Sequence, residues 1–416
     1  MAIDRSNSPV IVMNHSDKRS YKRSKNTNSP NSNHNRRGGR QGGGFKPSTL
    51  NPDLLVRKAT KLEEEKFVPS RKIIDLPVNQ GLIDKLVTKG YEVPTEIQDK
   101  SLEALLDGRD FLGIAQTGTG KTAAFLVPII NDLMRTRRKS SAIIVVPTRE
   151  LALQVEVEFK SITKGLGLYS TPLIGGTNIN RDRANTQRKP HVIIGTPGRI
   201  LDLVSRQWLD LRSFETLVLD EFDRMLDMGF QKDVMRIINT VGHRKQSMLF
   251  SATLDKKQQP LIDEILTDPV VVKVSSGTTT GESIDQEVIK IGADQNKFDV
   301  LQDLLAMDEI EKVLIFEETK HKVNKLSKML NQKGIRSDEI HGNKTQSARQ
   351  KALNNFKTGK VNVLVATDVA ARGIDVSDIT HVINYQVPQS FDTYIHRIGR
   401  TGRAGKVGKA YTLVGG

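Results

Sequence analysis

The sequence predicts an α/β protein made of two tandem lobes, each a parallel sheet covered by helices on both faces. Short, nearly continuous apolar runs alternate with amphipathic stretches, which is the pattern of buried parallel strands between helices. The alternation restarts after the Gly-, Ser- and Thr-rich run Ser275–Glu282, which is typical of a flexible linker. A length of 416 residues suffices for two or three domains. The expected segments are a disordered basic tail (1–66), a first lobe (67–274), a linker (275–285) and a second lobe (286–416).

The apolar runs define the expected strands of each lobe. Those of the first lobe are Phe111–Ala115, Ala142–Pro147, His191–Gly195, Thr216–Leu219 and Ser247–Phe250. Those of the second lobe are Gln286–Ile291, Lys312–Phe316, Val361–Ala366, His381–Asn384 and Lys409–Val414. The chain ends at Gly416, where we expect a closing helix, so the second lobe is expected to be truncated at its C-terminal end.

The chain is strongly basic, with a formal net charge of +15. Residues 1–46 hold ten Lys and Arg against two Asp, a difference of +8, in a sequence with too few apolar side chains to fold by itself. The run Arg36–Phe45 (RRGGRQGGGF) resembles RNA-binding RGG segments, and a solubilising tail is the alternative of equal weight. The charge indicates a polyanionic partner, which is either nucleic acid or a membrane surface.

Composition excludes several other classes of protein. Without cysteine the chain has no disulfide, no thiolate metal site and no cysteine nucleophile. Its apolar runs are too short to cross a bilayer, and its N-terminus lacks the apolar stretch of a signal peptide. We therefore expect a cytoplasmic protein without a membrane partner.

A candidate phosphate-binding loop, Ala115–Thr122 (AQTGTGKT), lies between an expected strand and an expected helix. Its glycines allow backbone N–H groups to curl toward phosphate oxygens. Lys121 supplies a cation near the β- and γ-phosphates, and Thr122 offers a hydroxyl to Mg²⁺. The predicted binding residues are Thr117, Gly118, Thr119, Gly120, Lys121 and Thr122. A glycine-rich turn without a ligand is the alternative, but it would not explain the strand before the loop and the helix after it.

Asp220 and Glu221 follow an apolar strand, at the sheet edge where open α/β sheets bind ligands. Asp220 is suited to hold Mg²⁺ through water, and Glu221 to orient and deprotonate an attacking water. Capping of the next helix is the alternative, and the phosphate loop in the same lobe favours the catalytic interpretation.

Further motifs follow one another in a fixed order along both lobes. They are Gly90–Gln98 (GYEVPTEIQ), Pro147–Ala152 (PTRELA), Gly175–Gly176, Thr196–Arg199 (TPGR), Ser251–Thr253 (SAT), Leu314–Phe316 (LIF), Gln346 with Arg349, Ala366–Asp375 (ATDVAARGID) and His396–Arg403 (HRIGRTGR). This order resembles the DEAD-box family of ATP-dependent RNA helicases, from about Ile73 to Val414. The resemblance implies two RecA-like lobes, with ATP and Mg²⁺ as cofactors.

The resemblance also implies roles for individual residues. Gln98 would read the adenine edge and Asp375 would take the ribose hydroxyls. Ser251 and Thr253 would couple the nucleotide state to closure of the lobes. Arg400 and Arg403 would be arginine fingers, and His396 would bridge to the carboxylate motif. The implied RNA contacts are Pro147, Thr148, Arg149, Gly176, Thr196, Arg199, Gln346, Arg349, Thr367 and Gly373.

The arginine motif supports this interpretation on physical grounds as well. Arg397, Arg400 and Arg403, with glycines between them, can bring planar cations close to phosphate. An arginine finger accelerates phosphoryl transfer by on the order of 10³–10⁵. A solvated run of surface charge is the alternative, although it would not require the glycine spacing.

Two positions depart from the family pattern. The carboxylate motif reads DEFD, so the ring of Phe222 must find space just after the strand, and coupling of ATP to RNA becomes the point in doubt. The isolated aromatic upstream of Gln98 is replaced by Ile73, which loses stacking on adenine at a cost of about 1 kcal/mol.

We expect ATP and single-stranded RNA to close the lobes together and to displace a paired strand locally, without processive movement. Contacts with the RNA backbone predict binding that is independent of sequence, and the 2′-OH favours RNA. The protein is expected to act as a monomer, and to be able to work within ribonucleoprotein complexes. The alternatives are an RNA clamp or scaffold with weak unwinding, a DNA translocase of the same superfamily, and a P-loop ATPase that acts on protein. The last leaves the second lobe's arginines and the basic tail unexplained.

Overall fold

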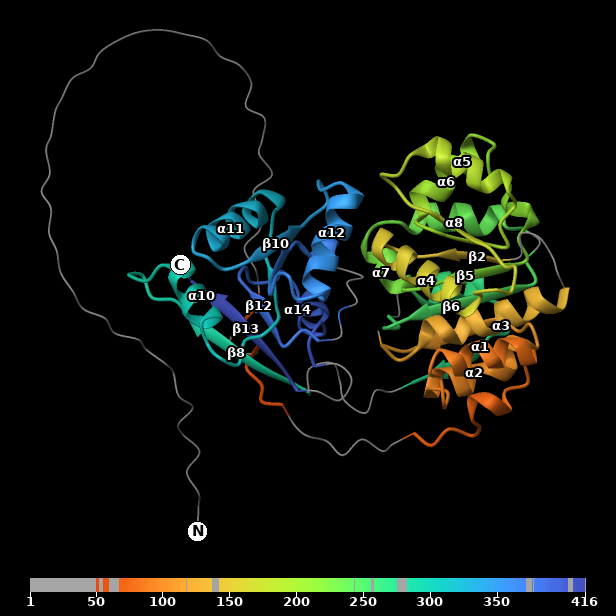
Figure 1. The fold of residues 1–416 in the computed structure, drawn as a ribbon, viewed down its shortest axis with the longest axis horizontal. Coiled ribbons are helices and arrows are strands. Elements are labelled where there is room, and N and C mark those ends of the chain that lie inside the picture. Colours follow the sequence, from red (N-terminus) through yellow and green to blue (C-terminus); the bar gives the residue numbers. More distant parts are fainter. Residues whose placement is uncertain are drawn as a thin grey trace, which may run out of the picture. The chain divides into compact units, whose positions relative to one another are not determined.

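The computed structural model describes residues 50–51, 55–59, 67–116, 118–136, 142–242, 244–255, 258–274, 283–371, 376, 378–402 and 407–415. The RGG-like run and the linker run 275–282 lie outside the described residues. Two parallel sheets with helices against their faces confirm the predicted fold of two RecA-like lobes (Figure 1).

The first lobe is built on a seven-stranded sheet with the strand order β3-β4-β2-β5-β6-β1-β7. Every pair of neighbouring strands in it is parallel. The strands are β1 (Phe111–Ile114), β2 (Ala142–Val145), β3 (Ser170–Leu173), β4 (Val192–Gly195), β5 (Thr216–Leu219), β6 (Gln246–Ser251) and β7 (Val270–Lys273). The helices are α1 (Gln80–Thr88), α2 (Glu96–Leu106), α3 (Lys121–Thr136), α4 (Arg149–Ile162), α5 (Ile179–Gln187), α6 (Pro197–Ser205), α7 (Phe222–Asp227), α8 (Gln231–Thr240) and α9 (Gln259–Ile265).

Alternate residues of each central strand face opposite hydrophobic cores. In β2, Ile144 packs into the core beneath α1 to α4, whereas Ile143 and Val145 pack into the core beneath α6 to α9. Successive side chains of a strand point to opposite faces, so a strand covered by helices on both sides has to be apolar throughout. The continuous apolar run at Ala142–Val145 is therefore the direct signature of this layered arrangement.

The second lobe repeats the design with a six-stranded parallel sheet, ordered β10-β11-β9-β12-β13-β8. Its strands are β8 (Ile284–Lys290), β9 (Val313–Phe316), β10 (Ser337–Ile340), β11 (Val363–Ala366), β12 (His381–Asn384) and β13 (Gly408–Val414). Its helices are α10 (Lys297–Leu305), α11 (Lys320–Gln332), α12 (Gln346–Lys357), α13 (Asp368–Ala371) and α14 (Phe391–Ile398). Beneath them lie two separate apolar clusters, one under α10 and α11 and one under α12 and α13.

Three strands were not predicted: β3, β7 and β10. Each of them lies at an edge of its sheet. Edge strands are only partly covered, so their sequences need not be continuously apolar; β10 (SDEI) has a half-buried middle, and in β7 only Val272 is buried. The apolar pattern that revealed the central strands is therefore weak at the edges.

Residues 55–59 fall within the tail that was expected to be disordered, yet they make specific contacts. Leu55 is fully buried, and Arg57 forms an antiparallel β-bridge with Gln286 of β8. The expectation does not hold for this stretch, because the few apolar side chains of the tail include one that packs among apolar residues of the second lobe.

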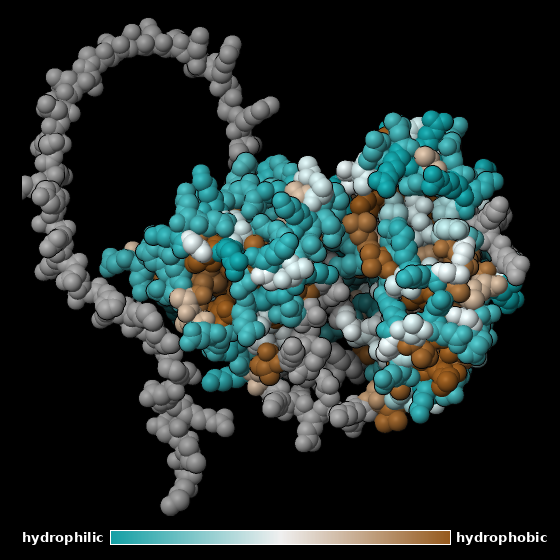
Figure 2. Space-filling model, in the orientation of Figure 1, coloured by the Kyte–Doolittle hydropathy of each residue, from teal (hydrophilic) through white to brown (hydrophobic). Residues whose placement is uncertain are grey.

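On the face shown in Figure 2, hydrophilic residues cover most of the described surface, and hydrophobic residues appear in separate patches. Among the described helices, none is both long and apolar enough to cross a membrane.

Candidate active site

The strand order of the first lobe gathers three sequence motifs at one edge of its sheet. β5, β6 and β1 are neighbours, and their carboxyl ends lead into Asp220, Ser251 and the phosphate loop respectively. Ala115 is tied to this edge because its N–H donates to the carbonyl of Ser251 at 2.9 Å. Ligands of open parallel sheets bind at this edge. The motifs are far apart in sequence, and the topology makes them one site.

The phosphate loop has the backbone that the glycines were predicted to permit. Gly118 and Gly120 have φ of 91° and 93°, a region that residues with a Cβ rarely adopt. A Cβ on Gly120 would lie 2.6 Å from Nε2 of Gln98. That amide donates to the Gly120 carbonyl at 3.1 Å, and its Oε1 accepts from the N–H of Thr95 at 3.0 Å. Gln98 therefore holds the start of α2 directly against the loop.

Lys121 is buried, and its Nζ donates to the carbonyl of Ala115 at 2.6 Å. The ammonium group thus lies against the first residue of its own loop. Thr119 closes the turn from the other side, because its hydroxyl donates to the Gln116 carbonyl at 2.8 Å. Thr122 follows in the first turn of α3, and Thr117 lies outside the described residues.

Asp220 and Glu221 are both buried, and the structure shifts their pKa values in opposite directions. Burial raises the pKa of Asp220 to about 6, although the charge of Lys121 opposes the shift. Burial also acts to raise the pKa of Glu221, but the charges of Arg224 and Lys121 outweigh it, so that pKa is lowered. Adjacent acids with diverging pKa values are typical of a site where one must release or hold a proton.

Arg224 is a functional candidate that the sequence analysis missed. Its Nη1 donates to Oε2 of Glu221 at 2.5 Å within a buried ion pair, one turn into α7. Glu221 itself has φ of 55° and ψ of 50°, a left-handed conformation that is uncommon outside glycine. The spacing of an acid and an arginine three residues apart could have indicated the pair, but only if α7 were known to begin there.

Asp223, the last acid of the carboxylate motif, links it to the SAT motif. Its Oδ2 accepts from the N–H groups of Ala252 and Thr253, at 3.1 and 3.0 Å, and from the Thr253 hydroxyl at 3.0 Å. Ser251 then donates to the carbonyl of Thr253 at 2.6 Å. The two predicted coupling residues, Ser251 and Thr253, are thus joined to the motif of Asp220 and Glu221 through a carboxylate that was not predicted as a site residue.

The two residues that depart from the family pattern, Phe222 and Ile73, both pack in hydrophobic cores. Phe222 is 1% exposed and packs in the core beneath α6 to α9, which supplies the space that its ring requires. Ile73 is 3% exposed and packs against the core beneath α1 to α4, near Gln98. The side chain of Ile73 is therefore largely enclosed by protein.

The predicted RNA contacts of the first lobe form two small clusters. Thr148 caps α4, its hydroxyl accepting from the Leu151 N–H at 3.2 Å. The guanidinium of the next residue, Arg149, lies against Gly175 and Gly176, so close that a Cβ on Gly176 would be 2.6 Å from Nη1. Pro147, Thr148, Arg149 and Gly176 are thus brought together.

Thr196 precedes α6, and Arg199 lies in the first turn of that helix. Arg199 is engaged with protein groups, because it forms an ion pair with Asp182 at 2.7 Å and donates to the carbonyl of Thr177 at 2.8 Å. Its observed bonds hold the turn after Gly176 in place.

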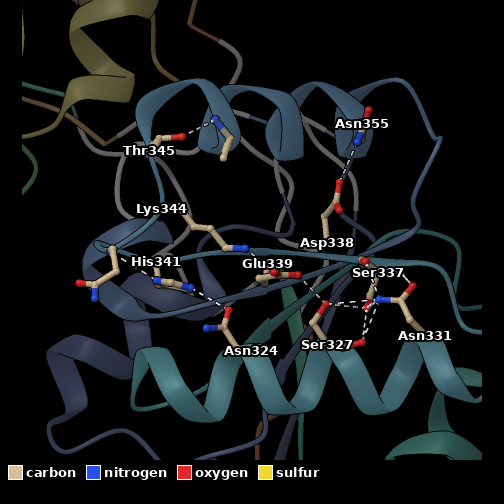
Figure 3. A network of polar contacts seen from close by, with 12 residues as sticks. Asn324, Ser327, Asn331, Ser337, Asp338, Glu339, His341, Lys344, Thr345 and Asn355 are labelled. Atoms are coloured by element: carbon tan, nitrogen blue, oxygen red, sulfur yellow. Dashed lines mark hydrogen bonds and ion pairs between the residues drawn. The ribbon is translucent and has the colours of Figure 1, made fainter. Parts of the chain in front are cut away.

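In the second lobe, a buried polar network supports the turn that leads to Gln346 and Arg349. Figure 3 shows side chains of α11 and β10 pointing toward one another across it. The hydroxyls of Ser327 and Ser337 are 3.0 Å apart, and Ser327 also donates to Glu339, which accepts from Lys344.

His341 completes this network at the end of β10. Its Nδ1 accepts from the Asn343 N–H at 3.3 Å, so the proton is on Nε2, which donates to Oδ1 of Asn324 at 2.8 Å. Burial, aided by the charge of Lys344, lowers the pKa of His341, which keeps the ring neutral. Thr345 then caps α12 by accepting from the Ala348 N–H at 3.3 Å. The predicted contact residues Gln346 and Arg349 therefore lie in the first turn of a helix whose start is held rigidly.

The arginine motif divides into different roles. Arg397, which was expected to approach phosphate, instead pairs with both carboxylate oxygens of Asp368, at 2.6 and 2.8 Å, and donates to Asn384 and to the Gln386 carbonyl. That part of the prediction is wrong, because a fully engaged, 4% exposed guanidinium is a structural link within the second lobe. Arg400 lies beyond α14, and its Nε donates to the His396 carbonyl at 3.4 Å. Thr367 follows β11, whereas Gly373, Asp375 and Arg403 lie outside the described residues.

The comparisons with known proteins agree with this geometry. Residues 95–261 match the family model described as DEAD/DEAH box helicase, and residues 296–405 match the helicase conserved C-terminal domain. The DEAD-box ATP-dependent RNA helicase CshA of Bacillus cereus is 42% identical over 326 residues, which are 78% of this chain and 62% of that protein. CshA of Bacillus licheniformis is 41% identical over 340 residues, which are 82% of this chain and 70% of that protein. The chain thus spans about 62% of the length of the first of these relatives.

Solved structures give the same assignment. A structure of Saccharomyces cerevisiae Dbp5 bound to RNA and ADP BeF3 is 30% identical, covers 83% of this chain and 90% of that chain, and has a TM-score of 0.74. A structure of Mss116p bound to ssRNA and AMP-PNP is 30% identical, covers 86% of this chain and 77% of that chain, and has a TM-score of 0.76. With its ordered motifs, its two RecA-like sheets and these relatives, the chain belongs to the DEAD-box helicase family.

Proposed function

We propose that this protein is an RNA-stimulated ATPase that uses ATP binding and hydrolysis to clamp RNA and to unwind short duplexes locally. The observation that carries the proposal is the single sheet edge where the phosphate loop, two buried acids and the SAT motif meet. Asp223 joins the last two of these directly, which provides a physical route from the nucleotide site to the remainder of the lobe.

Each group at this edge has a distinct task in hydrolysis. Lys121 leaves its position on the Ala115 carbonyl to neutralise the β- and γ-phosphates. Glu221 has a lowered pKa, so it is ionised at neutral pH and can accept a hydrogen bond from the attacking water. Gln98, which contacts the loop through Gly120, would lie beside the nucleotide and read the adenine edge with its amide.

Mg²⁺ would be held by Asp220 and by the hydroxyl of Thr122. Among the described residues, no group of three or more His, Cys, Asp or Glu side chains could hold a metal by itself. A donor set this small fits magnesium, which keeps several waters and binds through one or two carboxylates together with substrate phosphates. The bound ion would neutralise charge on the phosphates. Burial raises the pKa of Asp220 because it disfavours the negative charge, and a bound cation would stabilise that charge.

The second lobe would supply the remaining groups, which are Arg400 and Arg403 for the γ-phosphate, His396 as a bridge, and Asp375 for the ribose. Hydrolysis then depends on closure of the lobes, and RNA bound to both of them favours closure. Guanidinium groups act on the charge that develops in the transition state, so their loss lowers kcat more than it raises KM.

RNA would be held through its backbone by the first-lobe cluster around Arg149 and by the start of α12. Backbone contacts fix position without reading bases, and the 2′-OH distinguishes RNA from DNA. The protein is proposed to act as a cytoplasmic monomer, alone or within ribonucleoprotein complexes.

Steady-state ATP hydrolysis with and without single-stranded RNA tests the proposal. We expect RNA, and not DNA of the same sequence, to stimulate turnover. We expect Glu221→Gln to abolish turnover and Arg400→Ala to lower kcat by on the order of 10³-fold. Arg336→Ala, an exposed arginine of the second lobe outside these motifs, is the matched control and should behave as the wild type. Turnover that is equal without RNA, or unchanged in Arg400→Ala, would contradict the proposal.

An RNA clamp with weak unwinding is the second candidate, and the departures from the family pattern at Phe222 and Ile73 favour it. Displacement of a short RNA duplex separates the two functions. A helicase releases the strand at a rate that follows ATP turnover, whereas a clamp hydrolyses ATP and retains RNA with little release.

A further inference from the structure

Residues 55–59, which we call the upstream segment, precede the first lobe in sequence but pack on the second. The N–H of Arg57 donates to the carbonyl of Gln286 at 3.1 Å, and the N–H of Gln286 donates to the carbonyl of Arg57 at 2.7 Å. This exchange is that of a hydrogen-bonded pair between antiparallel strands. Two residues on, the N–H of Ala59 donates to Oδ1 of Asp285 at 2.8 Å. These contacts occupy the free side of β8, the edge strand of the six-stranded sheet (Figure 1).

Leu55 anchors the upstream segment in a small apolar core of the second lobe. Its side chain is fully buried among residues of the second lobe, namely Ile284, Tyr394, Ile398 and Ala410. They come from β8, α14 and β13, so Leu55 packs where three elements of that lobe meet. Its neighbour Val56 is 57% exposed, so of these two side chains only that of Leu55 enters the core.

Tyr394 connects this core to the arginine motif. Its hydroxyl lies 3.2 Å from the Leu55 carbonyl and 3.0 Å from Oε1 of Gln286, so it ties α14 to both the upstream segment and β8. Tyr394 and Ile398 are four residues apart and share the face of α14 that meets Leu55. His396 lies in the last turn of the same helix, and Arg400 lies two residues beyond its end.

From these contacts we infer that the upstream segment is an accessory strand of the second lobe, and that Leu55 and Tyr394 are positioning residues for Arg400. The inference rests on the proposed role of Arg400 in ATP hydrolysis. Tyr394, Arg397 and Ile398 share the buried face of α14, which Arg397 holds through Asp368 and the upstream segment holds through Leu55. With the helix held at both contacts, the turn after α14 has a defined position, and a displacement of about 1 Å at a catalytic group can cost roughly 100-fold in rate.

Substitutions in the full-length protein test the positioning role. We expect Leu55→Ala to lower kcat for RNA-stimulated ATP hydrolysis roughly ten- to hundred-fold, while KM for ATP changes less than about two-fold, because the phosphate loop lies in the other lobe. Leu55→Met, which keeps the volume, should restore kcat. Val56→Ala is the matched control from the same segment and should equal the wild type. A wild-type kcat for Leu55→Ala overturns the inference.

A disulfide tests the docking itself, independently of activity. The chain has no cysteine, so Arg57→Cys with Gln286→Cys creates a single pair. Hydrogen-bonded antiparallel partners have Cα atoms about 5.5 Å apart, within reach of a disulfide. We expect mild oxidation to join them without denaturant, whereas Val56→Cys with Gln286→Cys should not join, because adjacent strand residues point to opposite faces.

The oxidised protein also shows whether the segment stays in place during turnover. We expect oxidation to leave the kcat of the reduced double variant unchanged, because an accessory strand need not leave; the reduced form is the reference because Gln286→Cys removes the acceptor of the Tyr394 hydroxyl. Failure to crosslink, or a loss of activity on oxidation that reduction reverses, overturns the inference. If the wild type shows no RNA-stimulated hydrolysis, the proposed function fails, while the crosslinking result still decides whether the segment docks.

Discussion

Replacing Asp220 by Asn should abolish ATP hydrolysis and yet make the free protein more stable. The carboxyl is buried, and burial raises its pKa from 3.8 to about 6 despite the opposing charge of Lys121. Asn keeps the side-chain oxygen that accepts from the Glu221 N–H at 2.9 Å, and it removes the buried charge. The substitution thus removes the free-energy cost of burying a charged carboxylate while it keeps the hydrogen bond to the Glu221 N–H.

The size of the gain follows from the pKa shift. A change from 3.8 to about 6 means that ionisation of Asp220 costs the folded protein about 3 kcal/mol relative to the unfolded chain. Asp220 is fully buried, so solvent screening reduces this value little. For a lobe of roughly 200 residues, about 3 kcal/mol corresponds to a rise in Tm of roughly 6–12 °C.

The gain should depend on pH with a definite sign. The pKa of Asp220 is raised in the folded protein, so the folded protein holds this proton more tightly than the unfolded chain does. The stability gained from the protonated carboxyl is therefore fully present below about pH 3.8 and is lost as the pH rises through about 6. Asp220→Asn should therefore match the wild type near pH 4, gain progressively between about pH 4 and 6, and hold a constant advantage above that range.

Thermal unfolding without nucleotide or Mg²⁺, at about pH 7.5 and pH 4.5, measures this difference. Asp223→Asn is the matched control, and its sign should be opposite. Oδ2 of Asp223 accepts from Ala252 and Thr253, and its Oδ1 accepts from the Arg224 N–H, so an amide leaves at least one buried donor unpaired, at about 1–3 kcal/mol. Should Asp220→Asn unfold at or below the wild-type temperature near pH 7.5, burial would not dominate the electrostatics of this acid.

Three further predictions concern the cores and the second lobe. Phe222→Ala recreates the family's DEAD sequence but leaves a cavity beneath α6 to α9, so urea unfolding should show a loss of about 3–5 kcal/mol; an unchanged midpoint would mean that the core collapses around the gap. Arg397→Met should destabilise the second lobe by about 3 kcal/mol, since Asp368 loses its bidentate partner, and a stability equal to the wild type would show the pair to be dispensable. The lowered pKa of His341 means that the unfolded chain binds its proton more tightly, so stability should fall as the pH drops below about 6.5, and His341→Gln should show a shallower decline in Tm between about pH 7.5 and 5.5.

The amino-acid sequence by itself determined the fold class and most of the nucleotide site. Central strands covered on both faces must be apolar throughout, which is why β2, β4 and β9 could be located from local composition alone. The glycines of the phosphate loop, the acids after β5 and their order along the chain are likewise local features, because each depends on neighbours in sequence.

Only the tertiary structure decided what the remaining polar and apolar groups do. Asp223 meets Thr253 across 30 positions of sequence, and Arg397 meets Asp368 across 29, so neither pairing has a local signature. Leu55 was hidden for the same reason, since the short apolar run Leu54–Val56 names no partner until β8, α14 and β13 come together around one of its side chains. A local pattern of apolar residues shows which side of a strand or helix faces the core. The partner of a buried charge or of an isolated side chain depends instead on how elements that are distant in sequence pack together.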